Sequence, residues 1–187
     1  GLLIIGTGKM TKALPELTGQ DKEYIATLRL GETTASYDAE TPVLETLPWE
    51  HITEDEVRSV LASFVGEIQQ RPPSFSAKRF QGERGYKLSR WGEPVDMVHV
   101  QARIDALELL GIRGAEVTLR VACSKGTYIR SLAHDIGQTL GPGAHLIALR
   151  RTRSGSLSVT DALTVEQWSA WLDTWAEGRQ STDGHST

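Results

Sequence analysis

Residues 123–137 read Cys-Ser-Lys-Gly-Thr-Tyr-Ile-Arg-Ser-Leu-Ala-His-Asp-Ile-Gly and contain the clearest structural pattern in the sequence. Apolar and polar residues alternate over 117–123, which predicts a strand. Apolar residues then recur at helical spacing over 129–140, which predicts a helix. Gly126 at the junction permits a tight turn or the close approach of a ligand. The stretch therefore predicts a strand leading into a helix N-terminus, a place suited to anions, although an exposed turn with solvated charges is the alternative.

Length and composition indicate one globular domain. The chain has 187 residues, of which 39% are hydrophobic and 24% charged, as in ordinary globular proteins. No apolar run approaches the ~20 residues that cross a bilayer, so a membrane protein is excluded. Cys123 is the only cysteine. It is predicted to be a small core residue, and the lack of any disulfide favours a reducing cytoplasm.

The charges are unevenly distributed. The net charge is −4, yet eleven of the twenty Lys and Arg residues fall in two windows, 71–90 and 121–153. The first window contains one acid, Glu83, and the second contains Asp135. A local positive face on an acidic protein is compatible with RNA binding, and equally with a merely basic surface.

The remaining patterns predict an α+β domain around a mixed, largely antiparallel sheet flanked by helices. Strands are predicted at 2–5, 22–30, 97–109, 115–123 and 144–150, and helices at 12–17, from the Thr53 cap to Ile68, at 129–140, and from the Thr164 cap onward. The strand at 2–5 reads as buried and interior. Residues 177–187 are polar and small, and are predicted to be a disordered tail.

Residues 74–94 interleave aromatic rings with basic side chains. Phosphates need cations and unstacked bases need rings, so this segment favours RNA contact; a surface loop with a hydrophobic anchor is the alternative. Residues 6–12 resemble a phosphate loop but lack the required glycine at position 3, so no nucleotide cofactor is predicted. No metal-ligand spacing or Ser/His/Asp pattern is present either.

Several motifs together resemble the TruB-type family of pseudouridine synthases, the bacterial tRNA pseudouridine-55 synthases. They are Ser-Lys-Gly-Thr-Tyr-Ile-Arg at 124–130, His-Asp-Ile-Gly at 134–137, Gly-Ala-His-Leu-Ile-Ala-Leu-Arg-Arg at 143–151, Gly-Lys-Met-Thr-Lys at 8–12, Asp-Lys-Glu-Tyr at 21–24 and Pro-Ser-Phe-Ser-Ala at 73–77. The resemblance implies the pseudouridine synthase fold and isomerisation of uridine to pseudouridine in the T-loop of tRNA, without metal or organic cofactor.

The resemblance also implies roles for individual residues. The family's nucleophilic aspartate would lie five residues before Gly1, outside this sequence. Tyr24 matches the tyrosine that stacks on the target base and is a candidate for handling the C5 proton. Arg130 matches the arginine that pairs with the nucleophile.

Further matches concern the substrate. Tyr128 and Leu149 match the uracil pocket, Asp38 a polar contact near the flipped nucleotides, and Lys12 a structural or RNA-contacting lysine. An RNA-clamping thumb is implied at about 73–95. The two basic windows add Lys78, Arg79, Arg84, Lys87 and Lys125 as the predicted RNA-binding residues. Lys78 and Arg79 depart from the family pattern, in which an apolar residue and then a lysine stand there.

Three hypotheses follow from the sequence. The first is a tRNA pseudouridine-55 synthase whose catalytic domain occupies 1–176, expected to be a monomer that binds the T-arm of tRNA. The second is the related guide-RNA-dependent synthase, which the thumb segment argues against. The third is a non-catalytic RNA-binding or tRNA-folding protein, because the aspartate is outside the sequence.

Overall fold

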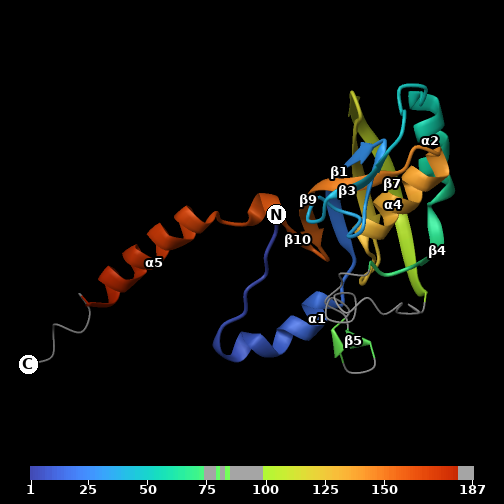
Figure 1. Cartoon of the computed structure of the whole chain (residues 1–187). Helices are drawn as coiled ribbons and strands as arrows, with labels where there is room; N and C mark the ends of the chain where they lie inside the picture. Colours follow the sequence, from blue (N-terminus) through green and yellow to red (C-terminus); the bar gives the residue numbers. More distant parts are fainter. Residues whose placement is uncertain (74–78, 81–82, 85–98, 181–187) are drawn as a thin grey trace, which may run out of the picture.

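The computed structural model describes residues 1–73, 79–80, 83–84 and 99–180 (Figure 1). A six-stranded sheet has the order β10-β9-β1-β8-β7-β4, and every neighbouring pair is antiparallel. Its strands are Lys22–Leu30 (β1), Gly66–Gln70 (β4), Val100–Arg113 (β7), Glu116–Cys123 (β8), Ala144–Ser154 (β9) and Leu157–Ser158 (β10). The predicted α+β class with a largely antiparallel sheet is confirmed.

Smaller elements surround this sheet. Two short hairpins pair Glu32–Thr34 (β2) with Val43–Thr46 (β3), and Arg79–Phe80 (β5) with Glu83–Arg84 (β6). The helical segments are Gly8–Ala13 (η1), Leu14–Thr18 (α1), Glu54–Ser63 (α2), Ile129–Leu140 (α4), Val159–Asp161 (η2) and Val165–Gln180 (α5). No helix in the described part of the chain is both long and apolar enough to cross a membrane.

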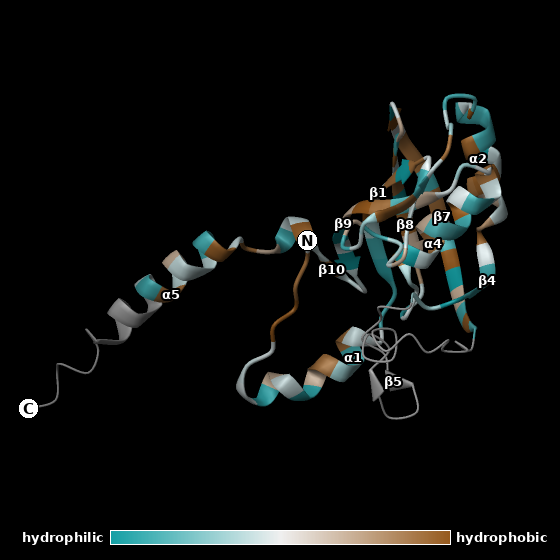
Figure 2. Cartoon of the chain, in the orientation of Figure 1, coloured by the Kyte–Doolittle hydropathy of each residue, from teal (hydrophilic) through white to brown (hydrophobic). Residues whose placement is uncertain are grey.

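The core lies between one face of the sheet and the helices α2 and α4 (Figures 1 and 2). Alternate residues of β1 and β8, such as Leu28 and Val121, are almost fully buried there against Leu132 and Ile136 of α4. α4 comes very close to β9: a Cβ atom on Gly137 would lie 2.1 Å from the backbone nitrogen of Ala144. Within the part of the chain that the structure describes, no helix covers the opposite face of the sheet (Figure 1).

The prediction of a buried strand at residues 2–5 is wrong. The Leu2 N–H donates to the Arg151 carbonyl of β9 at 2.8 Å, and the Leu2 side chain is buried. The segment then leaves the edge of the sheet, so Leu3 and Ile5 are 71% and 74% exposed. Only the first residue of the apolar run is therefore buried, while Ile4 is half-buried.

The helix predicted to reach Ile68 ends earlier than expected, and its last five residues are not helical. α2 begins at the confirmed Thr53–Glu56 capping box and ends at Ser63. Gly66 has a φ of 112°, which breaks the helical path, and Ile68 then pairs with Ala102 of β7. The apolar spacing continued by chance from the helix into a strand that sequence reasoning missed.

Other boundaries differ in extent. β7 continues to Arg113, beyond the predicted end at 109, and β9 continues to Ser154, beyond the predicted end at 150. The Thr164–Gln167 capping box is confirmed. α5 then extends away from the sheet (Figure 1) and runs to Gln180, past the predicted start of the tail at 177; residues 181–187 lie outside the described residues.

Candidate active site

An ion pair marks the N-terminal turn of α4. The Arg130 Nη1 donates to Asp38 Oδ2 at 3.0 Å, and the two side chains are 24% and 15% exposed. Asp38 lies in the loop between β2 and β3. Its second oxygen accepts hydrogen bonds from the Ser36 hydroxyl at 2.5 Å and from the Glu40 N–H at 3.0 Å.

These contacts set the charge of Asp38. Burial by itself raises the pKa of the carboxyl group, but the hydrogen bonds from Ser36 and Glu40 and the positive charge of Arg130 outweigh it, so the pKa lies below its ordinary value. Asp38 is therefore an anion at neutral pH. The result is a fixed pair of opposite charges, and Asp38 is a partner for Arg130 that sequence reasoning did not assign.

The start of α4 is held by the end of β4. The Gln70 side chain is fully buried; its amide nitrogen donates to the Tyr128 carbonyl at 3.2 Å and its oxygen accepts from the Tyr128 N–H at 2.9 Å. The Ser131 hydroxyl donates to the Arg71 carbonyl at 2.7 Å. These bonds fix the turn that carries Tyr128 and Arg130. Sequence reasoning missed Gln70 because it did not recognise β4.

Tyr24 and Leu149 lie on the helix-covered face of the sheet. In the register of β1 with β9, Leu149 is opposite Ala26, and Arg151 is opposite Tyr24. Directly paired residues point to the same face of a sheet, and Ala26 is buried in the core on the helix-covered face. Tyr24 packs against the core, and burial raises the pKa of its phenol despite the nearby Arg151. Leu149 is 46% exposed. A half-buried ring and an exposed apolar side chain are thus available to a ligand on this face.

The first residues of the chain also reach this part of the sheet. The Arg151 guanidinium donates to the Leu2 carbonyl at 3.0 Å and 2.6 Å, in addition to the backbone bond between the two residues. Arg151 is the β9 partner of Tyr24. The backbone at Gly1 and Leu2 therefore runs beside the strand pair that carries Tyr24.

The other predicted RNA-binding residues are spread over the molecule. Lys12 is exposed on η1, which lies away from the sheet (Figure 1). Lys125 is exposed in the turn before α4, where Gly126 has a φ of 80°. Arg79 and Arg84 occupy paired positions of the β5–β6 hairpin, whereas Lys78 and Lys87 lie outside the described residues.

The predicted core role of Cys123 is confirmed. Its side chain is 1% exposed, and burial raises the pKa of the thiol to about 11. The thiol is therefore neutral and inaccessible at physiological pH, which excludes it as a nucleophile in this fold.

Solved structures indicate the class of the fold. One is titled a Cbf5–Nop10–Gar1 complex, with a TM-score of 0.68 and 32% identity over 91% of this chain and 41% of that chain. Another is titled an H/ACA RNP bound to a substrate RNA containing 2′-deoxyuridine, with a TM-score of 0.64 and 29% identity over 91% of this chain and 40% of that chain. The chain thus spans about two fifths of these neighbours.

Sequence comparisons identify the family. Residues 1–129 match the N-terminal domain of the TruB family pseudouridylate synthases, and residues 130–183 match the C-terminal domain of tRNA pseudouridylate synthase B. The chain belongs to the TruB family of pseudouridylate synthases, which are isomerases, and the predicted resemblance is confirmed.

Curated relatives support the same assignment. The tRNA pseudouridine synthase B of Phocaeicola vulgatus is 50% identical over 173 residues, which cover 92% of this chain and 74% of the relative. The protein of the same name from Bacteroides fragilis strain YCH46 is 47% identical with the same coverage. That from Mycobacterium sp. strain KMS is 45% identical over 89% of this chain and 57% of the relative.

Proposed function

We propose that this chain forms most of a tRNA pseudouridine synthase that isomerises uridine 55 in the T-loop of tRNA. The observation that carries the proposal is the Asp38–Arg130 pair on the N-terminal turn of α4, in a chain about half identical to enzymes named for this reaction class. The single buried cysteine supports a cytoplasmic setting, and we propose that the enzyme acts as a monomer without metal or organic cofactor.

The reaction explains which groups are needed. Isomerisation breaks the bond between N1 of uracil and C1′ of ribose, turns the base, and forms a new bond from C5 to C1′, after which C5 loses its proton. A carboxylate must reach C1′ or C6, so the uridine must be flipped out of its loop. The detached base must then be held in a site that excludes water.

The described residues can supply the holding groups. The ring of Tyr24 offers a stacking surface for a flipped pyrimidine, and Leu149 and Tyr128 offer further pocket walls. The Tyr24 hydroxyl is a candidate acceptor for the C5 proton. Arg130 would hold a second carboxylate, the nucleophile, ionised and aimed, with Asp38 fixing the guanidinium from the other side.

The course of the backbone at Gly1 supports the position of that nucleophile. The family resemblance places the aspartate five residues before Gly1. Gly1 and Leu2 run beside Arg151, opposite Tyr24, so a segment preceding Gly1 would enter the region of the proposed uracil site. Lys125 and the residues Lys78, Arg79, Arg84 and Lys87 are proposed to contact tRNA phosphates, with Lys12 as a further contact.

The guide-RNA-dependent alternative has one supporting observation, the similarity to structures titled as ribonucleoprotein complexes. Curated tRNA pseudouridine synthases match this chain at 45–50% identity, against about 30% for those structures. The tRNA enzyme is therefore the better-supported proposal.

The proposal is tested with the protein produced from its complete gene, including whatever precedes Gly1. Purified enzyme is incubated with an unmodified tRNA transcript alone, and pseudouridine is mapped at single-nucleotide resolution. We expect modification at position 55, its loss in a tRNA carrying cytidine there, and its loss when the aspartate expected five residues before Gly1 is replaced by asparagine. Modification elsewhere, a requirement for a guide RNA, or an asparagine variant of full activity would contradict the proposal.

A further inference from the structure

A second contact joins α4 to the loop of Asp38. One helical turn after Arg130, the imidazole of His134 stacks on the ring of Tyr37, with ring centroids 4.0 Å apart and planes 13° apart. Tyr37 directly precedes Asp38. Residues four apart lie on the same side of a helix, so α4 contacts this loop twice, through the guanidinium of Arg130 and through the ring of His134.

The backbone at Tyr37 is in a conformation that needs support. Of the non-glycine residues that the structure describes, only Tyr37 has a positive φ, of 62°. This left-handed conformation costs a side-chain-bearing residue about 1–2 kcal/mol, so surrounding contacts must hold it. The Tyr37 carbonyl accepts from the Leu146 N–H of β9 at 2.9 Å, which fixes the backbone on one side.

The contact that His134 makes with the loop uses the face of its ring and not its Nδ1 atom. The buried Nδ1 has no hydrogen-bond partner among the described residues. Burial lowers the pKa of the imidazole, so it is neutral at physiological pH. An imidazole that makes no hydrogen bond at Nδ1 and stacks face to face acts as a flat aromatic surface.

We infer that the Tyr37–His134 stack is a positioning device for the proposed reaction: it holds the strained turn at Tyr37 so that the next residue, Asp38, meets Arg130. His134 is then a positioning residue, which acts through the loop without touching the substrate. The inference rests on the proposed function only for the expected change in the single-turnover rate. The geometry of the loop can be measured without tRNA.

The experiment compares four variants of the full-length protein. His134→Ala and Tyr37→Ala remove the stack, His134→Phe keeps a ring of similar size without the unsatisfied nitrogen, and Val57→Ala is the matched control. Val57 is buried on α2 in the hydrophobic core and takes no part in the stack, so its truncation destabilises the core without removing the stack. Each variant is assayed for single-turnover rate at saturating tRNA, tRNA affinity, melting temperature and hydrogen exchange of the Leu146 amide.

We expect His134→Ala and Tyr37→Ala to lower the single-turnover rate about tenfold or more, with tRNA affinity changed less than about twofold. Exchange of the Leu146 amide should accelerate in the same two variants. His134→Phe should keep both the rate and the exchange within about threefold of wild type, since the ring remains. Val57→Ala should lower the melting temperature and leave the rate and the Leu146 exchange nearly unchanged.

Three results would overturn the inference: a normal rate and normal exchange in His134→Ala, a His134→Phe variant as slow as His134→Ala, or an equal rate loss in Val57→Ala. The second result would assign the imidazole itself a chemical role, and the third would reduce the effect to general destabilisation. If wild-type protein modifies no tRNA, the proposed function fails, and the exchange measurement still decides whether the stack positions the loop.

Discussion

The two faces of the sheet both hold an arginine paired with carboxylates, but in different settings. On the open face, Arg120 of β8 donates to Glu23 of β1 at 2.6 Å and to Glu108 of β7, and Thr152 donates to Glu23 at 2.8 Å. On the helix-covered face, Arg130 meets Asp38, which comes from a loop. The first arginine joins three neighbouring strands, whereas the second joins a helix start to a loop.

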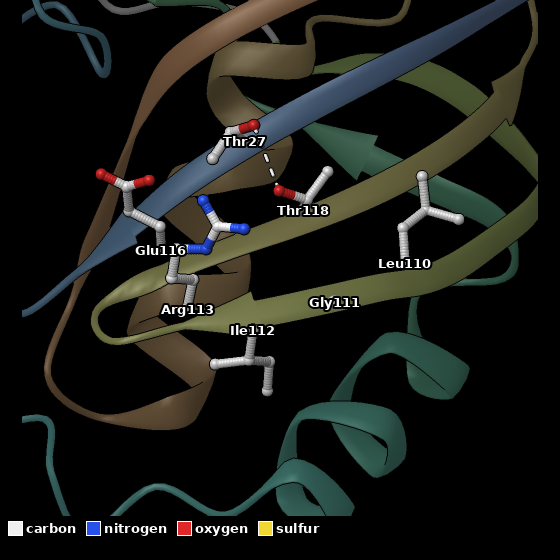
Figure 3. A pocket seen from close by; sticks show the side chains of 7 residues that line it. All are labelled: Thr27, Leu110, Gly111, Ile112, Arg113, Glu116 and Thr118. Carbon is white, nitrogen blue, oxygen red and sulfur yellow. Dashed lines mark hydrogen bonds between the residues drawn. The ribbon is translucent and has the colours of Figure 1, made fainter.

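These settings indicate that the ion pairs of Arg120 are structural, whereas the ion pair of Arg130 is a candidate for catalysis. The groups around Arg120 are all fixed by strand register, and near them a shallow hollow of about 350 Å³ is lined by residues of β1, β7 and β8, among them Thr27, Arg113 and Thr118 (Figure 3). Around Arg130, the partners are held by two supports: the buried Gln70 side chain beneath the helix start and the half-buried Tyr37–His134 stack beside the loop. An arrangement supported in this way can hold charge in place for a substrate.

The largest expected change in the free energy of unfolding comes from a substitution on the helix-covered face, and a substitution on the open face should have little effect. Gln70→Leu removes both hydrogen bonds between the buried Gln70 side chain and the Tyr128 backbone, while the Tyr128 carbonyl keeps its bond from the Leu132 N–H, so the free energy of unfolding should fall by about 1–3 kcal/mol. On the open face, Thr27→Val removes a 3.3 Å hydroxyl contact with Thr118 and should change the same quantity by less than about 0.5 kcal/mol. Urea unfolding of the full-length protein measures both, and equal effects would show that Gln70 is not a special support.

A smaller expected effect is the contribution of His134 to the pH dependence of the free energy of unfolding. The pKa of His134 is lowered by burial, so below the ordinary value of 6.5 the unfolded chain binds a proton that the folded chain does not. The free energy of unfolding should therefore decrease as the pH falls from about 6.5 toward the lower pKa of the folded state. His134→Phe should flatten this part of the stability–pH curve. An unchanged slope in this variant would show that His134 titrates normally in the folded protein.

Local signals in the sequence predicted much of the fold. The strand at 22–30, the helix at 129–140 and both capping boxes are confirmed because each depends on spacing within a few residues. The failures at residues 2–5 and at Ile68 arose because an apolar pattern does not say whether a neighbouring strand is present to pair with. Periodicity alone could not correct either error.

The contacts within the candidate site could not be predicted from local sequence patterns. The family resemblance selected Asp38 and Arg130, but their ion pair joins positions 92 residues apart, and no local pattern predicts that contact. The same holds for Gln70 and Tyr128, which are 58 residues apart. The stack of His134 on Tyr37 depends on a helix crossing a loop at one angle, which only the tertiary structure provides.

One matched pair of variants tests the proposal that the helix-covered face performs the isomerisation. Arg130→Gln and Arg120→Gln make the same chemical change on opposite faces of the same sheet. Single-turnover rates and tRNA affinities of both variants are measured in the full-length enzyme at a temperature where both are folded. We predict that Arg130→Gln lowers the rate by about 10²–10³ with tRNA affinity within about threefold, and that Arg120→Gln changes the rate less than about twofold. Equal rate losses in the two variants, or an Arg130→Gln variant that loses affinity and keeps its rate, would contradict the claim.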